Sequence, residues 1–365
     1  KKLASFTLEQ SSIEDTQQVR QWLLTALELA QQNYRENPCY ESRRDLSGSY
    51  HQLLSYAAEH DADSDQTAQW LEKALALDQR NYLENPCYES RQDLSFSYFK
   101  QADFIVQEDS GQAMQLYLES LALRTQNNRE KPSYESRADL ADIYGALADL
   151  NAESSDPEDR EQARKWYLQA LELNQNLYRE KPCYDNRSDL AGSYKDLSFL
   201  VIKDGTQKDF LQARKWHLAA LELDRQNYQE KPDYENRRAL IMDLNVIGGL
   251  FAKIKEPGAA AQEESYLRES AKLCEENHLA KPCQESRQDL ARALIRLSDI
   301  AVRQGSPEDL SQGQQLLLRA LELNTQSYEQ SPGFSTKRSV SLVYDKLSNI
   351  AVKRGTDEDL KQALG

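Results

Sequence analysis

The chain repeats a short proline-centred phrase at nearly constant spacing, and this periodicity limits the possible folds more than any other feature. Seven prolines follow one another at intervals of 48, 46, 50, 50, 50 and 50 residues, namely Pro38, Pro86, Pro132, Pro182, Pro232, Pro282 and Pro332. A repeat period of roughly 20–50 residues is typical of proteins whose neighbouring units stack to bury a continuous core. The sequence therefore predicts a repeat architecture.

Each repeat contains two helical patterns. After the proline, apolar residues recur at helical spacing, as in Leu190, Tyr194 and Leu197, and this pattern predicts a first helix, helix A. A second pattern, with small residues such as Ala163 and Ala170, predicts helix B. One repeat is thus expected to be an antiparallel pair of helices of roughly 20 residues each, about 30 Å long. Such a pair cannot bury its apolar stripe alone, so neighbouring pairs must stack.

Signals for helix ends support this division. A small polar residue followed three positions later by an acid, as in Ser42 with Asp45, predicts a capping box at the start of helix A. A glycine is expected to end helix A in three repeats, at Gly205, Gly305 and Gly355. Residues suited to the start of helix B follow at Asp156-Pro157, Thr206, Ser306-Pro307 and Thr356.

The two helical patterns together resemble the tetratricopeptide repeat (TPR). The resemblance rests on Tyr194, Leu197 and Ser198 in helix A, and on the small residues of helix B with the Ala170-Leu171-x-Leu173 motif. It covers about residues 14 to 364. The usual TPR unit has about 34 residues, whereas these units have 46 to 50, as in the long-helix variant of kinesin-light-chain-like arrays and bacterial signalling proteins.

The resemblance implies an all-α, right-handed superhelical solenoid of about seven repeats. We expect residues 1–13 to be an N-terminal extension, and residues 14–365 to form one solenoid that begins with a helix B at about 14–36. The last helix A is expected at about 334–354, followed by a truncated helix B. The repeat after Pro232 fits worst because Gly248-Gly249 lies inside its helix A, so this repeat is expected to be bent or loose.

Composition excludes some function classes. The 45 Lys and Arg are outnumbered by 60 Asp and Glu, which gives a net charge of −15, and no stretch suggests a basic face. Nucleic acid is therefore not an expected partner. No run approaches 18 apolar residues, and the first residues lack the apolar centre of a signal peptide. We expect a cytoplasmic protein, and because residue 1 is Lys and the last pattern stops at Gly365, part of a longer chain.

Four of the five cysteines directly follow a repeat proline, at Cys39, Cys87, Cys183 and Cys283. Equivalent positions in stacked repeats are roughly 16–20 Å apart, too far for a disulfide or a shared zinc ion. A thiol near a helix N-terminus can be reactive. However, a catalytic residue is needed once, whereas these recur, so we interpret them as buried packing residues. Cys274 is expected in the core.

An arginine recurs at the fifth position after the proline in six repeats, at Arg43, Arg91, Arg137, Arg187, Arg237 and Arg287. A cation in the first turn of a helix opposes the helix dipole, so a partner is required. The glutamates that precede the prolines, from Glu36 to Glu230, and the neighbouring tyrosine are the candidate partners. A structural lock of the turn is the favoured interpretation, and a ladder of cations for anionic ligands is the alternative.

No catalytic motif stands out. The four tryptophans (Trp22, Trp70, Trp166, Trp216) share one position of helix B, which is typical of a core stripe, and the four histidines are scattered. The sequence contains no phosphate-binding loop, dinucleotide fingerprint or nucleophile elbow. Carboxylates are expected on solvated faces and caps. We therefore predict no enzyme activity, no metal and no cofactor.

Residues that differ between repeats can carry specificity. In the TPR resemblance, helix A lines a concave groove, which on this chain corresponds to the tenth, thirteenth, fourteenth and seventeenth residues after each proline. The expected partner-binding residues on these positions are Phe96, Phe99, Lys100, Asp103, Asp149, Lys195, Phe199, Met242, Asn245, Arg292 and Arg296. Aromatic residues beside charged ones are typical of anchors with a polar rim. Packing of these aromatics against the adjoining repeat is the alternative.

The sequence therefore predicts a protein–protein interaction scaffold or sensor module. A peptide, helix or partner domain would bind in the groove, and the chain would be part of a larger bacterial-type signalling or defence protein. A structural spacer or self-association module is the alternative, because the end helices are expected to expose apolar residues near Trp22 and Ile350. A cysteine-based enzyme is a weaker third hypothesis.

Overall fold

The computed structural model describes residues 13–60, 64–203 and 205–355. Within these ranges the regular structure is helical throughout and contains no strand, as expected for an all-α protein. The residues form two compact units, which divide inside the seventh helix, between Leu177 and Tyr178. Each unit is described by itself below.

Unit 1 contains α1 (Ile13–Glu36), α2 (Tyr40–Glu59), α3 (Ser64–Glu84), α4 (Tyr88–Ile105), α5 (Ser110–Glu130), α6 (Tyr134–Ala152) and most of α7 (Pro157–Glu180). Unit 2 contains α8 (Tyr184–Ile202), α9 (Gln207–Glu230), α10 (Tyr234–Lys253), α11 (Ala259–Ala280), α12 (Gln284–Gln304), α13 (Pro307–Gln330) and α14 (Phe334–Arg354). Even-numbered helices are the predicted A helices, and odd-numbered helices are the predicted B helices.

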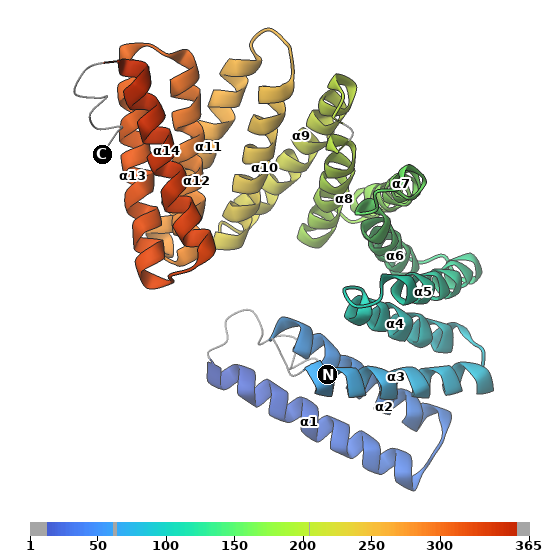
Figure 1. Ribbon diagram of the computed structural model, residues 1–365. Helices are drawn as coiled ribbons and strands as arrows, with labels where there is room; N and C mark the ends of the chain where they lie inside the picture. The colour runs from blue at the N-terminus through green and yellow to red at the C-terminus, as the bar shows by residue number, and fades with distance from the viewer. Residues whose placement is uncertain (1–12, 61–63, 204, 356–365) are drawn as a thin grey trace. The chain divides into compact units, whose positions relative to one another are not determined.

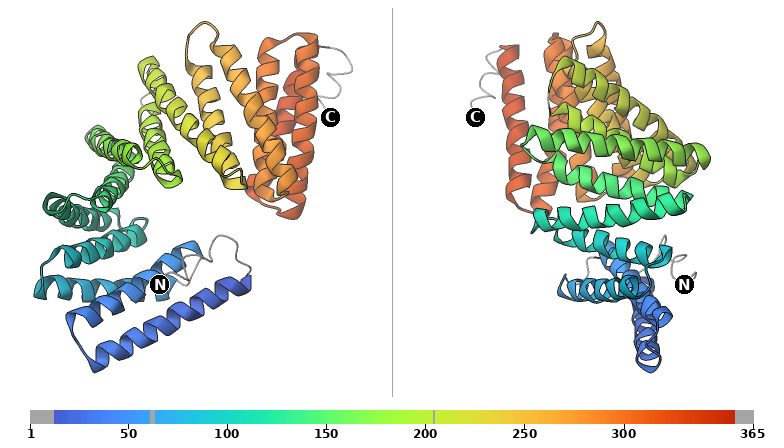
Figure 2. Two further views of the ribbon diagram at one scale, coloured as in Figure 1. Left: turned by 180° about the vertical axis from the view of Figure 1, so that it is seen from behind. Right: turned by 90° about the vertical axis from the view of Figure 1, so that its right-hand side faces the viewer.

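In each unit the helices pack mainly against their neighbours in sequence. Figure 1 shows α1 to α5 following one another as antiparallel neighbours in unit 1, and α10 to α14 standing side by side in unit 2. Figure 2 shows the same order from two other directions. The predicted stacking of two-helix repeats in sequential order is confirmed.

The A helices begin three residues earlier than the capping pattern predicted. The residue directly after the proline is the N-cap, as at Cys39, whose backbone is extended (φ −121°, ψ 177°). Ser42, expected as the cap, is instead the third helical residue, and its hydroxyl accepts from the Cys39 N–H at 3.0 Å and donates to the Asn37 carbonyl at 2.6 Å. Because one serine satisfies both sides of the turn, Asp45 is not part of the cap.

Most of the remaining predicted helix ends agree with the structure, but Gly205 does not end α8, which stops at Ile202 with its cap at Lys203. Ser306 and Thr206 cap their B helices through Asp309 and Asp209. Gly305 and Gly355 end α12 and α14 in the left-handed conformation that glycine adopts without strain. Thr356 and the truncated last helix B lie outside the described residues, as do residues 1–12 of the expected N-terminal extension.

The repeated cysteines are helix caps, so their interpretation as buried filler is wrong. Cys39, Cys87, Cys183 and Cys283 are each partly exposed and begin an A helix. The Tyr40 hydroxyl lies 3.6 Å from the sulfur of Cys87, one repeat further on. All five cysteines are free, and Cys274 is buried in the core as predicted.

The repeated arginine closes the antiparallel pair to which it belongs. Arg43, at the start of α2, donates from Nε to the Asn81 side-chain oxygen at 2.8 Å and pairs with Glu84, both at the end of α3. Equivalent contacts join Arg91 to Asn127 and Glu130, Arg187 to Asn227 and Glu230, and Arg237 to Asn277. The structural lock is confirmed for these repeats, but the acid is the one that ends the following helix B.

Other contacts set neighbouring repeats against each other. In unit 1, Arg44 of α2 pairs with Asp93 of α4, and in unit 2 Arg238 of α10 lies 3.7 Å from Asp289 of α12. Both pairs join equivalent positions of consecutive A helices. The apolar core continues through each unit between successive helices, and it includes Trp70 of α3, whereas Trp22 of α1 is half exposed.

Helix A of the repeat after Pro232 is not broken, although two glycines lie inside it. Helix α10 runs without interruption from Tyr234 to Lys253. Gly248 is buried because the side chain of Leu267 in α11 packs directly onto it, and an added Cβ would lie 2.9 Å from that leucine. The glycine therefore permits a close approach of two helices and does not mark a break. One continuous solenoid over residues 14–365 and its right-handed superhelix stay predictions.

We predict opposite effects for two glycine substitutions in unit 2. Gly248→Ala gains up to about 1 kcal/mol of helix propensity but overpacks Leu267 by about 1–3 kcal/mol, so it should lower the free energy of unfolding. Gly192→Ala, in α8, meets nothing within 4 Å and should raise stability by up to about 1 kcal/mol. Urea unfolding followed by circular dichroism measures both. A stabilised Gly248→Ala would contradict the packing argument.

We predict that removing one arginine lock destabilises unit 1. Arg91→Ala leaves the buried amide of Asn127 without its donor and should cost about 2–4 kcal/mol of unfolding free energy. Arg80→Ala is the control, because Arg80 is exposed and its contacts with Glu84 of its own helix and with the Tyr34 hydroxyl of α1 lie in solvent, so it should cost much less. Equal losses in the two variants, measured by urea unfolding, would show that burial of the lock is unimportant.

Candidate functional site

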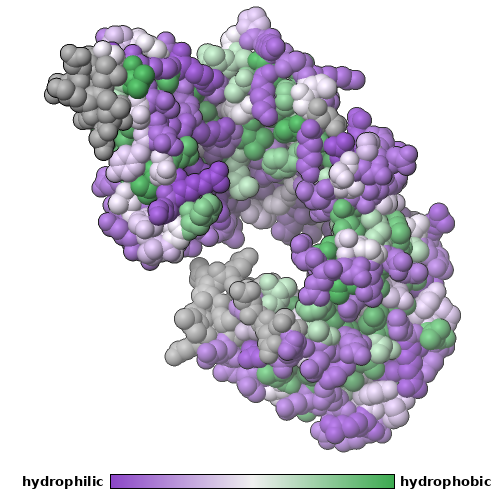
Figure 3. Space-filling model, viewed as in Figure 1, coloured by the Kyte–Doolittle hydropathy of each residue, from purple (hydrophilic) through white to green (hydrophobic). Residues whose placement is uncertain are grey.

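The expected partner-binding positions lie on one surface of the A helices in each unit, and we name this surface the A-helix strip. It consists of the tenth, thirteenth, fourteenth and seventeenth residues after each repeat proline. Its side chains are exposed or half-buried, except that of Ile295 in α12, which is buried. In Figure 3 hydrophobic residues form patches among mainly hydrophilic ones on the visible face of each unit.

In unit 1 the strip carries two half-buried phenylalanines on α4. Phe96 meets the His51 ring of α2 edge-on, with centroids 4.8 Å apart. Phe99 lies 5.6 Å from the Tyr117 ring and has the Arg124 guanidinium 4.7 Å from its centre. The phenylalanines therefore pack partly against adjoining helices, the alternative kept open by the sequence, while each retains some exposed surface.

The charged strip residues of unit 1 have partners within the unit. Lys100 lies over Phe96 and Phe99, 5.6 and 5.5 Å from the ring centres, and 3.6 Å from Asp103. Asp103 also accepts a hydrogen bond from the Tyr117 hydroxyl at 2.7 Å. Asp149 accepts a hydrogen bond from the Tyr167 hydroxyl in the same way. Burial raises the pKa of Asp149, and this hydrogen bond opposes the rise.

A cavity of about 330 Å³ opens beside Phe96, and we name it the α4 pocket. It is lined by His51 of α2, by Gln92, Asp93, Ser95 and Phe96 of α4, by Arg124 of α5 and by Asp139 of α6. The volume is at the lower end of the range for ligand pockets, roughly 300–1,000 Å³. Donors, acceptors and one aromatic ring therefore surround a space large enough for a side chain.

Behind the pocket lies a buried polar network that the sequence analysis missed. Asp78 of α3 is fully buried and lies 3.0 Å from His51 Nε2, and it accepts from the Ser97 hydroxyl at 2.6 Å. These contacts hold the His51 ring against Phe96. The network connects α2, α3 and α4, so it fixes one wall of the pocket.

In unit 2 the strip residue Lys195 enters a buried acidic cluster. Its ammonium pairs with Asp224 of α9 and lies 3.2 Å from Asp243 of α10. Asp243 is 1% exposed, and burial raises its pKa to about 8, a rise that Lys195 opposes and Asp224 supports. Phe199, one turn further along α8, is exposed and meets the His217 ring edge-on.

The other expected residues of unit 2 differ in their surroundings. Met242 is 59% exposed, and Arg292 is exposed beside Asp289 of its own helix. Arg296 of α12 donates to both the backbone and side-chain oxygens of Asn245 in α10, each at 3.0 Å. The structure therefore brings Asn245 and Arg296 together, while Met242 stands free of such contacts on the solvent-facing side.

A serine, a histidine and an aspartate meet in unit 2 but do not form an accessible catalytic site. Ser198 Oγ lies 2.7 Å from His217 Nδ1, and His217 Nε2 lies 3.9 Å from Asp243. Burial, together with the positive charge of Lys195, lowers the pKa of His217 to about 4. Because Ser198 and His217 are completely buried, no substrate can reach the hydroxyl.

Several of the buried polar residues that sequence reasoning missed share one position of helix B, directly after the second leucine of the Ala-Leu-x-Leu motif. This position reads Ala30, Asp78, Arg124, Asn174, Asp224, Cys274 and Asn324. The expectation that carboxylates lie only on solvated faces is therefore wrong for Asp78 and Asp224. A polar residue inside an apolar stripe was the available signal, because a buried polar group requires partners.

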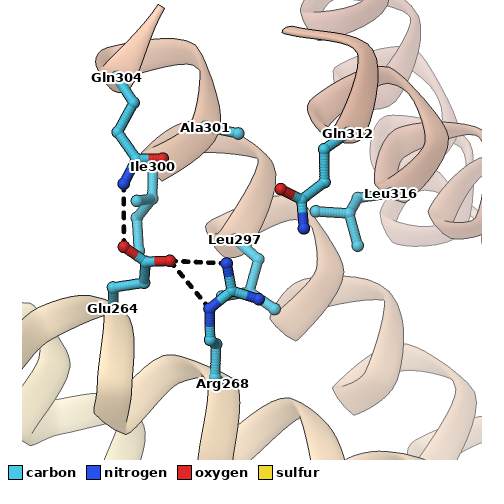
Figure 4. Close-up of a pocket in the computed structure, with 8 residues that line it drawn as sticks. All are labelled: Glu264, Arg268, Leu297, Ile300, Ala301, Gln304, Gln312 and Leu316. Atoms are coloured by element: carbon cyan, nitrogen blue, oxygen red, sulfur yellow. Dashed lines mark hydrogen bonds and ion pairs between the residues drawn. The ribbon is translucent and has the colours of Figure 1, made fainter. Parts of the chain in front are cut away.

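A second cavity, in unit 2, is too small for a ligand. Figure 4 shows it between α11, α12 and α13, where the Glu264 carboxylate joins the Gln304 amide and the Arg268 guanidinium. Its volume of about 30 Å³ is that of one water molecule. We interpret it as a gap between packed helices.

Two further classes of site find no support within the described residues. No group of three or more His, Cys, Asp or Glu side chains in that part of the chain is placed to hold a metal ion. A search of the same part for a helix both long and apolar enough to span a membrane finds none.

The comparisons with known proteins concern the fold. No family model and no curated protein matches the sequence. Among solved structures, BtubC (BKLC) from P. vanneervenii aligns with a TM-score of 0.53 at 18% identity, over 72% of this chain and 91% of that chain. The S. pombe nuclear import adaptor Nro1 aligns with a TM-score of 0.57 at 11% identity, over 83% and 99%. The chain therefore has the TPR-like helical-repeat fold that the sequence predicted.

We predict that unit 2 becomes less stable as the pH rises from 6.5 to 8. The folded state retains the Asp243 proton at pH values where the unfolded chain has released it, so unfolding becomes easier as this proton is lost. The slope should reach about 1.4 kcal/mol per pH unit for one proton. His217 acts in the opposite sense, but only below pH 6.5, because its pKa is lowered.

Urea unfolding of unit 2 at several pH values tests this prediction. Asp243→Asn should flatten the slope between pH 6.5 and 8, because the amide cannot titrate. Asp345→Asn, at an exposed strip position of α14, is the control and should leave the slope unchanged. A slope that persists in Asp243→Asn would assign it to another group.

Proposed function

We propose that the chain is a protein-interaction scaffold, which binds a peptide, a helix or a segment of a partner domain along the A-helix strip. The observation that carries this proposal is the contrast between two sets of positions. The positions that close and stack the repeats recur, as the Arg43-type locks do, whereas most strip positions keep some exposed surface and differ in chemistry from one repeat to the next.

Unit 1 offers the best-defined contact region. Phe96 and Phe99 are partly exposed anchors, with Lys100 and Asp103 as a polar rim and the α4 pocket beside them. Aromatic residues flanked by polar groups are typical of the centres of protein interfaces. Rings already held by His51 and Tyr117 lose little side-chain entropy on binding.

The fold supplies a precedent for this role. Nro1, which shares the fold at 11% identity, is a nuclear import adaptor. Within our proposal, the partner is a protein or peptide, and the chain serves as the sensor or scaffold part of a larger signalling or defence protein. That setting and the cytoplasmic location rest on the sequence alone.

Self-association is the second candidate, and the exposed end helices favour it. Trp22 and Leu29 of α1 are 49% and 63% exposed. On α14, Phe334, Leu342 and Val352 are exposed, whereas Ile350, expected to be unpaired, is buried under α13. A mass that rises with protein concentration in sedimentation, and falls in Trp22→Ser, would favour this candidate.

We predict that the double variant Phe96→Ala/Phe99→Ala loses peptide binding. Decapeptides are selected from a random display library on the purified chain. Some of them should bind the wild type at least tenfold more tightly than they bind the double variant, because the variant lacks both anchors. Phe104→Ala is the matched control, since Phe104 is exposed on the same helix but outside the strip. Circular dichroism checks that each variant is folded.

Two outcomes would contradict the proposal. Selection that yields no binding peptide would remove the support for a peptide-binding scaffold. Peptides that bind the wild type and the double variant equally, but depend on residues outside the strip, would assign binding to another surface.

A further inference from the structure

The first and the last described helices each lack a neighbour that their equivalents have. A helix A such as α4 packs more extensively against the helix B that follows it than against the one before it. Among the described residues, α1 is a helix B with no helix A before it, and α14 is a helix A with no helix B after it. One half of the larger helix contact is therefore open on α1, and the other half is open on α14.

The open face of α1 is the one that other B helices bury against a helix A. Residues at the same distance from the neighbouring repeat proline are equivalent. Ala26 is exposed, whereas the equivalent residue is buried in α3, α5, α7, α9, α11 and α13. Asn33 is exposed too, although its equivalents are buried in the same six helices. Trp22 and Leu29 lie on this side of the helix and add exposed apolar surface.

The open face of α14 is the one that other A helices bury against a helix B. Ser341 and Tyr344 are exposed, whereas the residue equivalent to Ser341 is buried in α2, α4, α6, α8, α10 and α12. Ser120 of α5 donates to the Ser95 backbone carbonyl of α4 at 2.8 Å. Ser120 is equivalent to Ala26, and Ser95 to Ser341. Small residues at these two positions therefore meet where a helix A and its helix B approach closely.

The two open faces also carry the separate halves of a lock. Glu36, at the end of α1, is equivalent to Glu84, which pairs with Arg43. Lys337, at the start of α14, occupies the position of Arg43. Glu36 and Lys337 are both exposed. The acid of a lock therefore lies on one open face, and a cation that can pair with it lies on the other.

A second pair of charges is matched in the same way. Arg44 of α2 pairs with Asp93 of α4, between consecutive A helices. Arg338 of α14 is equivalent to Arg44, and Asp45 of α2 is equivalent to Asp93, and both are exposed. If α14 received α1 as its helix B, α2 would follow as the next helix A. The arginine and the aspartate would then face each other.

We propose that α14 of one copy receives α1 of a second copy as its helix B, so that copies associate head to tail in the register of the internal repeats. Lys337 then pairs with Glu36, and Ser341 lies against Ala26. The two surfaces differ, so the contact is heterologous, and each copy can bind two others. This inference rests on self-association, the second candidate function, and it does not involve the A-helix strip.

Two tryptophan variants of the full chain test this register. Ala26→Trp and Ser341→Trp place a large side chain at an exposed small residue, so the fold should stay intact while the two faces are held apart. In sedimentation equilibrium the wild type should exceed the mass of one copy as its concentration rises. Each variant should weaken this association roughly tenfold or more. Glu28→Trp and Ser335→Trp are the matched controls, because these positions are exposed in every repeat, and they should associate like the wild type.

Mixing the two variants distinguishes this contact from a symmetric one. Ala26→Trp keeps an open α14, and Ser341→Trp keeps an open α1, so an equimolar mixture should form complexes of two copies and none larger. A mixture that stays at the mass of one copy would overturn the proposal. Loss of association in only one of the two variants would also overturn it, because that result indicates a symmetric contact. A wild type that stays at the mass of one copy would assign both faces to other partners.

Exchanged charges test the lock between copies. Lys337→Glu and Glu36→Lys should each weaken association roughly tenfold, because like charges then face each other. A chain that carries both changes should regain most of the wild-type affinity. If the double change weakens association further, the two residues do not meet.

Peptide binding is measured separately on the same variants. Ser341→Trp should bind the selected decapeptides as tightly as the wild type, because Ser341 lies outside the strip. A chain that binds peptides without associating would contradict only this inference. A chain that associates head to tail but yields no binding peptide would contradict only the scaffold proposal.

Discussion

The charged lock that Arg43, Arg91 and Arg187 form between the start of a helix A and the end of its helix B is the interaction on which the rest of the structure depends. Arg43, Arg91 and Arg187 are largely buried cations, and each needs both an amide oxygen and a carboxylate from the partner helix. A buried ion pair costs much to desolvate, so its value here is specificity more than stability. A helix pair that slipped by one residue would leave an arginine unpaired, and the register of each pair is therefore fixed.

Because the locks fix this register, the residues on one face of the A helices are not required to hold the helix pair together. The apolar stripe and the locks occupy the positions that repeat, and the side chains on the opposite positions change freely between repeats. Some of these variable residues still couple neighbouring helices, as Arg296 does with Asn245, and others remain exposed, as Met242 does. The scaffold proposal follows from this separation of structural and variable positions. The α4 pocket is the best-defined cavity beside the variable positions.

Much of the fold could be predicted from the sequence because its signals are repeated. The proline spacing placed each of the fourteen described helices, and the recurring arginine correctly indicated a lock. Errors arose where a local pattern is compatible with two structures. Ser42 can cap a helix as the residue before it or as its third residue. Gly248 can break a helix or allow Leu267 of the next helix to pack closely against it. The pocket was missed because Arg124 and Asp139 come from different repeats, and their proximity depends on packing that no local pattern encodes.

The third residue of each helix A, a serine in four repeats and Asn186, Asn236 or Thr336 in the other three, donates to the carbonyl five residues before it. Ser42 and its counterparts satisfy the turn from inside the helix, and the residue after the proline reads Cys, Cys, Ser, Cys, Asp, Cys and Gly along the chain. The side chains of Ser133 and Asp233 add a bond from the helix N–H, and the others vary. Such a position can drift without harm. In four of the seven repeats it offers a thiol at the same place in the repeat, to which a spectroscopic label could be attached or which could be deleted singly.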